Sequence, residues 1–550
     1  MQYENRSAPR GRFGRSNVPG AFAAMLCALA LAVPLHAQDA SGRVFGQVVA
    51  EESGEPLPGV RVYVRGTTRG NVTDRQGRFT IDRVPAGSQV VVFELLGMRE
   101  ERRSVRLPEG GEARLDVRLA TEALAIADIV VSATREAQAL ARTPATVGVV
   151  QGDALREERP THPSEVMDKV PGVWVNVTGG EGHMTAIRQP LTTDPVYLFV
   201  EDGVPTRSTG FFNHNALYEI NVPQAERIEV VKGPVTALYG SDAIGGVINV
   251  ETRPAVAAPG LQATVEAGQH GFGRILGSYA ATGERDGLRA DLNLTRTDGW
   301  RDGTAYDRQS GTLRWDRTLG GGSSLKTVAA FSRIDQQTAG SSRLPEDAFE
   351  DRPTLNLTPV SFREVTAGRL SVEYEHSAGS SLLSVTPFAR YNAMNILPNW
   401  SLTYDPAIWE TSNGSLGVLA RYRRDFEPMD ARLIAGVDVD WSPGRHFERV
   451  IEPEREDGAY TSYSAGDPIY DYDVTFLGLS PYLHAEASPT PRLRLTGGLR
   501  FDRIGYTYEN RLGALQTGSH RRPSSTDVAY TEWSPKLGAT YEIGAGASVF

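Results

Sequence analysis

Cysteine is almost absent from this 550-residue chain, which contains only Cys27. That residue lies inside the apolar run "AFAAMLCALALAV", which follows several arginines and precedes "LHA", a suitable cleavage site after Ala37. The arrangement predicts a secretory signal peptide over residues 1–37. Leu26 stands where a lipoprotein signal needs a small residue, so a lipid anchor on Cys27 is disfavoured. The exported chain would form no disulfides, and its stability must come from core burial and closed hydrogen bonding.

Long hydrophobic runs and blocks of charge are also missing. Beyond the N-terminus the sequence has no apolar run of about 18 residues, which argues against membrane-spanning helices. It does not argue against a membrane β-barrel, because barrel strands alternate and leave no hydropathy peak. The formal net charge is −10 with both signs interspersed, so nucleic acid is not an expected partner. A chain of this length predicts several domains.

Short alternating runs separated by glycine, proline and aspartate fill residues 38–120. They include "RVFGQVVA", "GVRVYVRG" and "SQVVVFELLG", a pattern typical of a sandwich of about seven short strands. The stretch "TDRQGRFTIDRVPAG" resembles the carboxypeptidase-regulatory-like domain, an Ig-like accessory module. We therefore expect an N-terminal Ig-like β-sandwich.

The next two segments differ in composition and in hydrophobic pattern. Residues 121–137 contain no glycine and one β-prone run, "DIVVSAT", which predicts an extended linker carrying one strand-forming segment. Residues 138–255 combine a short helical pattern, "SEVMDKVPGV", with the strand and turn "VYLFVEDGVP". This second segment is expected to be a mixed α+β domain.

From residue 256 onward the hydrophobic period becomes two. Leucines and alanines from Leu288 to Leu294 alternate with polar residues, and similar rows begin at Leu416, Leu433 and Leu493. Each row puts apolar side chains on one face of a strand and polar ones on the other. Strands of about ten residues joined alternately by short and long connections are typical of an outer-membrane barrel. The alternative is a soluble all-β protein, which the signal peptide and strand lengths disfavour.

The stretch "IEVVKGPVTALYGSDAIGGVINV" joins two apolar strands through many small residues. Glycine allows tight turns and close backbone approach, whereas a catalytic loop would need more than Ser241 and Asp242. The stretch resembles the plug signature of the TonB-dependent outer-membrane transporters, with Lys232 where the family usually has arginine. The signature positions, expected to be structural, are Glu229, Lys232, Gly233, Pro234, Tyr239, Gly240, Gly245, Gly246 and Asn249.

The resemblance spans residues 121–550 and implies an architecture dominated by β-structure. It implies a transmembrane antiparallel barrel of the 22-stranded type over residues 256–550, with an α+β plug, residues 138–255, in its lumen. It also implies a monomer in the lipid of the bacterial outer membrane, with the N-terminal domain in the periplasm. There the sandwich would bind a periplasmic partner or brace the linker.

The family's function is TonB-dependent active import of a scarce nutrient, most often a ferric siderophore or another iron chelate. Glycan, cobalamin and heme importers of the same family are alternatives, as is a non-transporting surface receptor or adhesin. Import makes and breaks no bond, so the resemblance implies no enzyme activity, no catalytic residue, no cofactor and no resident metal.

The run "DIVVSAT" resembles the TonB box, an extended segment that adds to an edge strand of TonB by main-chain hydrogen bonds. The alternative is a linker strand that packs on the sandwich. The residues expected to pair with TonB are Asp128, Ile129, Val130, Val131 and Ser132.

Two plug segments, "TGGEGHM" and "TRSTGFFNHNALY", are expected to face the ligand. They combine flat apolar groups with hydrogen-bonding groups, as binding sites do. The alternative is that their aromatic residues only pack the plug against the barrel. The candidate ligand-binding residues are His183, Arg188, Phe211, Phe212, Asn213, His214 and Tyr218.

One motif points to a different class of protein. His162 and Glu165 have the H-x-x-E spacing of a zinc peptidase. Pro163 lies between them and no third ligand is evident in the context, so a metal site here is disfavoured.

The barrel segment itself is expected to be incomplete. Twenty-two strands of about ten residues need roughly 220 residues, which leaves too few within 256–550 for the long loops. We therefore expect further barrel strands beyond residue 550. The alternative is a smaller intact barrel.

Overall fold

The computed structural model describes most of residues 41–120 and 143–550, together with Ile129–Val130, Arg135 and Gln138–Ala139 of the linker. Short gaps fall at 52–53, 58, 66, 68, 75, 96–97, 99–100, 195, 210–215, 258, 338–342 and 545–546. The chain forms two compact units that divide near residue 120. Within the described ranges, none of the helices is both long and apolar enough to cross a membrane.

The N-terminal unit is built from two four-stranded sheets, β4-β1-β7 with β8 beside β1, and β3-β2-β5-β6. Phe79 and Phe93 come from different sheets and pack edge to face, with ring centroids 5.4 Å apart. The predicted small β-domain is confirmed, with eight strands instead of about seven. The strands are β1 (Ser41–Ala50), β2 (Arg61–Val64), β3 (Gly70–Val72), β4 (Arg78–Pro85), β5 (Gly87–Glu94), β6 (Glu101–Leu107), β7 (Glu112–Arg114) and β8 (Val117–Leu119).

The second unit begins with a plug whose main sheet has the order β11-β16-β17-β14-β15. Apolar side chains fill both faces of this sheet, and the hairpin β12–β13 packs with the short helices over one of them. The plug elements are β11 (Thr146–Gln151), α2 (Gly152–Glu158), α3 (Ser164–Met167), β12 (Val173–Gly179), β13 (Gly182–Ile187), β14 (Tyr197–Glu201), β15 (Val204–Pro205), η2 (Ala216–Glu219), η3 (Val222–Gln224), β16 (Ala225–Lys232), α4 (Thr236–Tyr239) and β17 (Gly246–Thr252).

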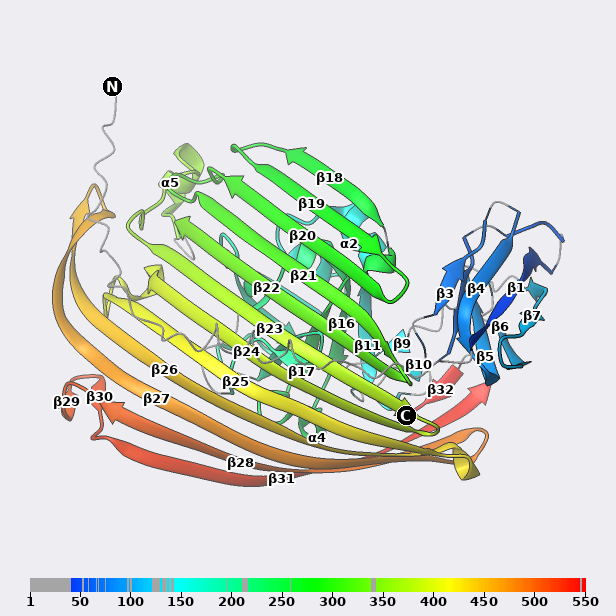
Figure 1. Cartoon of the computed structure of the whole chain (residues 1–550). Helices are drawn as coiled ribbons and strands as arrows, with labels where there is room; N and C mark the ends of the chain where they lie inside the picture. Colours follow the sequence, from blue (N-terminus) through cyan, green and yellow to red (C-terminus); the bar gives the residue numbers. More distant parts are fainter. Residues whose placement is uncertain are drawn as a thin grey trace. The chain divides into compact units, whose positions relative to one another are not determined.

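The rest of this unit is one 13-stranded sheet, here called the wall. All its neighbouring strands are antiparallel, with β18 and β32 at its edges, and it curves beside the plug strands (Figure 1). The wall strands are β18 (Gly260–Ala267), β19 (Gly273–Thr282), β20 (Asp286–Thr297), β21 (Tyr306–Gly320), β22 (Ser323–Gln337), β23 (Phe362–Ala378), β24 (Ser381–Leu397), β25 (Ala407–Phe426), β26 (Ala431–Glu456), β27 (Ala459–Thr490), β28 (Leu493–Asn510), β31 (Thr526–Gly544) and β32 (Ala547–Val549).

The two ends of the wall differ in their connections. At one end, here called the turn end, successive strands are joined by short links such as 379–380 and 491–492. The other, here called the loop end, carries long connections such as 338–361 and 511–525. The loop-end connections contain α5 (Glu346–Asp351), η5 (Asn399–Ser401) and the small hairpin of β29 (Leu515–Thr517) and β30 (His520–Arg522). The short helix η6 (Pro428–Asp430) lies at the turn end, and η4 (Ala255–Ala257) precedes β18.

Side chains of the wall alternate as the sequence predicts. On β20, Leu292 is 41% exposed on the outer face, whereas Arg289 and Asn293 are 1% exposed on the inner face beside the plug. An apolar outer face and a polar, buried inner face suit a sheet with lipid outside and a plug inside. The predicted fold class, a β-dominated chain with a large antiparallel sheet and a plug, is confirmed. The 22-strand count and the missing strands stay predictions.

Strands β26 and β27 are much longer than a membrane crossing requires. They have 26 and 32 residues, against about ten for a transmembrane strand. They remain paired up to the loop-end turn, where Glu456 lies opposite Ala459. A long two-stranded ribbon therefore projects beyond the other strands at the loop end.

Candidate functional site at the plug and the wall

The plug signature forms one antiparallel hairpin. Strands β16 and β17 pair in a register that places Ile228 opposite Val250 and Lys232 opposite Gly246, with α4 in the connection. A Cβ on Gly246 would lie 2.3 Å from the carbonyl oxygen of Val231. The small residues of the signature thus permit the close backbone approach expected from the sequence.

Gly246→Ala is expected to destabilise the plug by about 1–2 kcal/mol, because the backbone of β16 must move to admit the methyl group. Urea unfolding of the plug measures the effect. Gly414→Ala is the matched control, since an added Cβ there meets no atom within 4 Å. Equal stability of the two variants would contradict the close-approach explanation.

The polar signature residues form ties within the plug. Lys232 donates from Nζ to the carbonyl oxygen of Pro171 at 2.6 Å, and burial, followed by the nearby Arg188, lowers the pKa of Lys232. The Asn249 side-chain oxygen accepts a hydrogen bond from the backbone N–H of Gly203 at 3.1 Å. These contacts give the signature a structural part in holding the plug sheet to its connections.

The predicted TonB box is described only at Ile129 and Val130, which form β9. This strand pairs antiparallel with β10, Gln138–Ala139, so that Val130 lies opposite Gln138. Asp128, Val131 and Ser132 lie outside the described residues. Ile129 and Val130 therefore form a strand with an intrachain partner, and their pairing with TonB stays a prediction.

Arg135, a few residues after the predicted box, is bound to the wall. Its guanidinium donates to both carboxylate oxygens of Asp438 on β26, at 2.9 and 3.0 Å, and lies over the ring of Tyr239 at 4.5 Å. Arg421 on β25 donates to the Arg135 carbonyl oxygen at 2.8 Å. The linker is thus tied at one residue to the wall and to a plug signature residue.

Asp438 also binds a second arginine. Arg500 on β28 donates from Nη1 to Asp438 at 2.7 Å and to the carbonyl oxygen of Leu238 in α4 at 3.0 Å. Asp438 is 9% exposed and Arg500 is 4% exposed. One buried carboxylate therefore serves two arginines and joins the linker, the wall and the plug signature.

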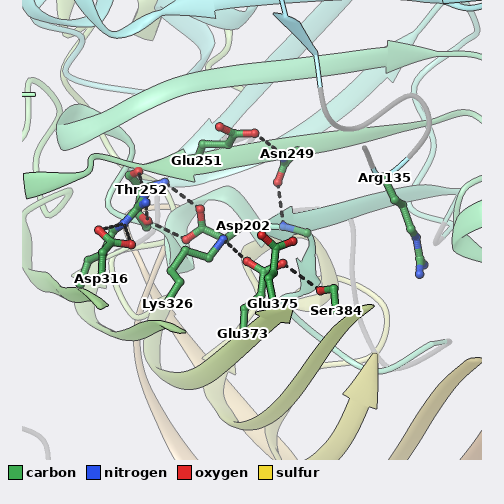
Figure 2. A network of polar contacts seen from close by, with 12 residues as sticks. Arg135, Asp202, Asn249, Glu251, Thr252, Asp316, Lys326, Glu373, Glu375 and Ser384 are labelled. Carbon is green, nitrogen blue, oxygen red and sulfur yellow. Dashed lines mark hydrogen bonds and ion pairs between the residues drawn. The ribbon is translucent and has the colours of Figure 1, made fainter. Parts of the chain in front are cut away.

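A further polar network fastens the plug sheet to the turn-end half of the wall (Figure 2). Asp202 accepts hydrogen bonds from the backbone N–H and hydroxyl of Thr252, at 3.2 and 2.6 Å. The carbonyl oxygen of Thr252 accepts from Arg314 on β21 at 2.7 Å. Arg314 is paired in turn with Asp316 at 2.9 Å. The end of β17 is thereby held to a wall strand.

The same network continues along the inner face of the wall. Lys326 on β22 pairs with Glu373 on β23 at 2.6 Å, and Arg421 pairs with Glu375 at 3.1 Å. On the plug side, Glu251 pairs with Arg227 at 2.9 Å. Burial raises the pKa of Glu251 to about 7 even though Arg227 opposes the shift. Glu251 is thus a plug group that titrates near neutral pH.

At the loop end the tip of the β12–β13 hairpin contacts the wall. Gln336 on β22 donates to the carbonyl oxygen of Gly179 at 3.1 Å and accepts from the backbone N–H of Glu181 at 2.9 Å. The Glu181 carboxylate pairs with Arg308 on β21 at 2.9 Å. This segment does lie at the loop end, where the sequence predicts ligand contact, but its polar groups are engaged by the wall.

Of the predicted ligand residues that it describes, the structure brings His183 and Tyr218 into contact and places Arg188 apart from them. His183 is fully buried, and its ring packs edge to face on His162 and Tyr218. Arg188 is exposed at the end of β13 opposite the hairpin tip. Tyr218 is buried, and its carbonyl oxygen accepts from Ser332 of the wall at 3.0 Å, as in the alternative in which it packs plug against wall. Phe211, Phe212, Asn213 and His214 lie outside the described residues.

The H-x-x-E pair serves local structure in the plug. The Nδ1 atom of His162 lies 2.8 Å from the hydroxyl oxygen of Ser164. The Glu165 carboxylate accepts from the backbone N–H groups of Thr161 and His162, at 3.2 and 3.1 Å. The residues that the structure describes hold no cluster of three or more potential metal ligands.

Sequence reasoning missed a set of rings on the inner face of the wall, here called the aromatic wall. Its rings pack in pairs, with centroids 5.1 Å apart for His446 and Tyr472 and 4.9 Å apart for Tyr472 and Tyr508. Tyr506 donates to the carbonyl oxygen of Thr209, so this surface adjoins plug segment 206–218. The aromatic wall comprises His446, Tyr470, Tyr472, Phe476, Tyr506 and Tyr508, and His520 of the loop-end hairpin packs against Tyr470.

The fold and the site together define a class: an antiparallel membrane-type sheet, apolar outside, that holds an α+β plug by polar contacts on its inner face. The sequence matches the family model "TonB dependent receptor-like, beta-barrel" over residues 267–550 and "TonB-dependent Receptor Plug Domain" over 139–247. Residues 44–131 match "CarboxypepD_reg-like domain". The chain belongs to the TonB-dependent receptor family, which is a family of the outer membrane.

Known relatives match this chain over different lengths, one in sequence over a short stretch and others in fold over most of the chain. The chain is 38% identical to "Vitamin B12 transporter BtuB" of Vibrio vulnificus strain CMCP6 over 143 residues, 26% of this chain and 23% of that protein. The ferric-catecholate import receptor Fiu from E. coli K12 superposes with a TM-score of 0.59 at 16% identity, covering 75% of this chain and 70% of that one.

A third relative is the pyoverdine outer membrane receptor FpvA from Pseudomonas aeruginosa PAO1, solved with pyoverdine bound. It superposes with a TM-score of 0.61 at 17% identity, covering 76% of this chain and 63% of that one. At such identities the solved structures establish the shared fold alone. The chain spans about a quarter of the length of the vitamin B12 transporter that it matches.

Proposed function

We propose that the protein imports an iron chelate across the bacterial outer membrane with energy delivered through TonB. The observation that carries the proposal is Arg135, which ties the residues just after the TonB box to Asp438 of the wall and Tyr239 of the plug. A pull on the box therefore reaches the plug through one buried contact. At the other end of the lumen, the aromatic wall offers a surface for a bulky ligand.

The choice of an iron chelate is supported by the names of the structural relatives, a ferric-catecholate receptor and a pyoverdine receptor. A cobalamin importer is the second candidate, because the vitamin B12 transporter has the higher sequence identity, 38% over 143 residues. Both candidates use the same plug and the same box. They differ in the ligand that the loop end accepts.

The proposed orientation places the loop end outside the cell and the N-terminal sandwich in the periplasm. Outer-membrane barrels have short periplasmic turns and longer external loops, and the connections of the wall divide in this way. TonB would then meet β9 from the periplasmic side, and a single copy would sit in outer-membrane lipid.

Val130→Pro is expected to abolish uptake while leaving ligand binding intact. Proline removes a backbone donor from the box, and pairing with TonB depends on main-chain hydrogen bonds. The complete gene would be expressed in a strain lacking its own iron receptors, and growth would be compared on ferric chelates, heme, cobalamin and oligosaccharides.

Val130→Thr is the matched control, because it keeps the backbone N–H and the β-branched shape and should import normally. Uptake that survives the proline substitution would refute the pairing at Val130. Ligand binding without uptake in either variant would favour a passive surface receptor.

A further inference from the structure

The outer face of the wall is hollowed across strands β19 to β22. One hollow, of about 530 Å³, lies midway along these strands, and a second, of about 450 Å³, lies next to it on the turn-end side. The strand register makes them neighbours, because the first hollow ends at one row of side chains and the second begins at the next row. These two rows are Tyr279, Ala290 and Leu313, and then Ala281, Leu288 and Trp315. The two hollows together are here called the outer groove.

Small residues create the outer groove. A Cβ on Gly277 would meet no atom within 4 Å, although Gly277 lies opposite the large Leu292 at mid-strand. On β25–β27, by contrast, the outer face presents an unbroken row of exposed large side chains, Leu416, Trp441 and Leu477. General contact with lipid needs only such an even apolar face. The outer groove is therefore a local feature that requires its own explanation.

The turn end of the outer groove carries a polar cluster. Trp315 donates from Nε1 to the carboxylate of Asp286 at 3.0 Å. Arg317 pairs with the same carboxylate at 3.5 Å and lies over the Trp315 ring at 5.7 Å. The side chains of Arg317 and Asp286 are both nearly half exposed. An aromatic ring beside charged groups at the edge of an apolar face is typical of the membrane interface.

The length of the outer groove matches one leaflet of a bilayer. Arg317 stands six residues after Gly311 on β21, which is about 20 Å of strand. At the usual tilt of barrel strands this length gives about 15 Å of depth, or half of a hydrocarbon core about 30 Å thick. A second copy of the protein would contact the wall along its full height. An apolar groove one leaflet deep with a charged end fits a lipid.

We propose that the outer groove binds one acyl chain of a phospholipid from the turn-end leaflet, whose phosphate group binds Arg317. A guanidinium binds phosphate oxygens with its fork of N–H donors. The exposed charges at this end are balanced, Arg285 and Arg317 against Glu284 and Asp286. This balance favours a zwitterionic headgroup, whose ammonium group would face the carboxylates. In the proposed orientation the lipid lies in the periplasmic leaflet, and its binding does not depend on what the protein imports.

Filling the outer groove tests the binding of the acyl chain. The complete protein in detergent would be mixed with dioleoylphosphatidylethanolamine, and the retained lipid would be counted by native mass spectrometry. The wild type should retain one lipid tightly, and Gly277→Leu should weaken its affinity about 10-fold, because the new side chain takes the place of part of the acyl chain. Gly414→Leu is the matched control on the outer face of β25, since a Cβ there also meets no atom within 4 Å.

The headgroup is tested by comparing this lipid with dioleoylglycerol, which has the same chains and no phosphate. Arg317→Gln should weaken binding of the phospholipid about 10-fold and leave binding of dioleoylglycerol unchanged, whereas Gly277→Leu should weaken both. Arg317→Lys keeps the cation and should lose less. Arg296→Gln is the matched control, an exposed arginine paired with Asp298 at 3.7 Å at the loop end of β20, and should bind both lipids as the wild type does.

The result that would overturn the inference is equal retention of the phospholipid by the wild type, Gly277→Leu and Arg317→Gln. A wild-type dimer that Gly277→Leu dissociates would also overturn it, because a second copy would then occupy the outer groove. Gly277→Ala separates filling of the groove from a disturbed strand, since it adds only a methyl group and should still retain the lipid. Loss of lipid by the alanine and leucine variants alike, with lowered thermal stability in both, would contradict the proposed site.

Discussion

Asp438→Ala is expected to weaken the hold of the linker and plug on the wall by about 3–5 kcal/mol. Removing this carboxylate leaves both Arg135 and Arg500 buried without their shared partner, and breaking one side of a buried ion pair costs about that much. The side chain of Asp438 lies where three parts of the molecule meet. The variant should therefore release the box segment without ligand or TonB.

The measurement can exploit the near absence of cysteine. A spin label introduced through Ser132→Cys would report release of the box as increased mobility of the label. Asp467→Ala, at an exposed position of β27, is the matched control and should leave the label unchanged. The double variant Arg135→Ala, Asp438→Ala should weaken the hold of the linker on the wall by less than the sum of the two single variants. Simple additivity would show that the two residues do not act together.

Glu251→Gln is expected to stabilise the plug by about 3 kcal/mol above pH 7. The folded plug raises the pKa of Glu251 from 4.5 to about 7 through burial, so the folded state holds the proton more tightly than the unfolded chain. This contribution to stability is complete below about pH 4.5 and is lost as the pH rises to about 7. Glutamine has no proton to lose, and Arg227 keeps Glu229 as a partner at 2.8 Å.

Urea unfolding of the plug between pH 4.5 and 8 tests this expectation. The advantage of the variant should grow between about pH 4.5 and pH 7 and stay level above about pH 7. The neighbouring charged groups that affect the pKa of Glu251 are Arg227, Glu229, Asp202 and Lys326. All four are unchanged in the variant. Glu157→Gln, an exposed change on α2, is the control. A constant difference at every pH would contradict the assignment to Glu251.

The fold was largely predictable because the wall repeats one local rule. Each strand reads as a two-residue alternation, and its outward and inward faces follow from that pattern alone, as Leu292 and Asn293 show. The eighth strand of the sandwich was harder to predict, since β7 and β8 have only three residues each. Such short strands depend on pairing with β1 more than on their own sequence.

The site was predictable only where its signal is local. The glycine pattern of the signature indicated a tight hairpin, and Tyr470, Tyr472, Tyr506 and Tyr508 stand two residues apart in strands, a spacing that could have revealed a row of rings on one face. Arg135 and Asp438, by contrast, are 303 residues apart. Their pairing is created by the tertiary fold.

The ribbon of β26 and β27 gives the protein a reach that a membrane pore does not need. Residues 459–471 of β27 extend past its pairing with β28, which begins at Tyr472, and they amount to roughly 40 Å of strand at about 3.3 Å per residue. Because the backbone of this ribbon is paired, we expect it to resist proteases better than an unpaired loop of the same length. Its tip packs on the neighbouring loops, since Ile451 and Tyr460 are buried with Leu402 and the N–H of Tyr460 donates to the carbonyl oxygen of Leu357 at 2.9 Å. In the proposed orientation the ribbon and these loops therefore form one outer surface, which a phage, an antibody or a bacteriocin would meet before the plug.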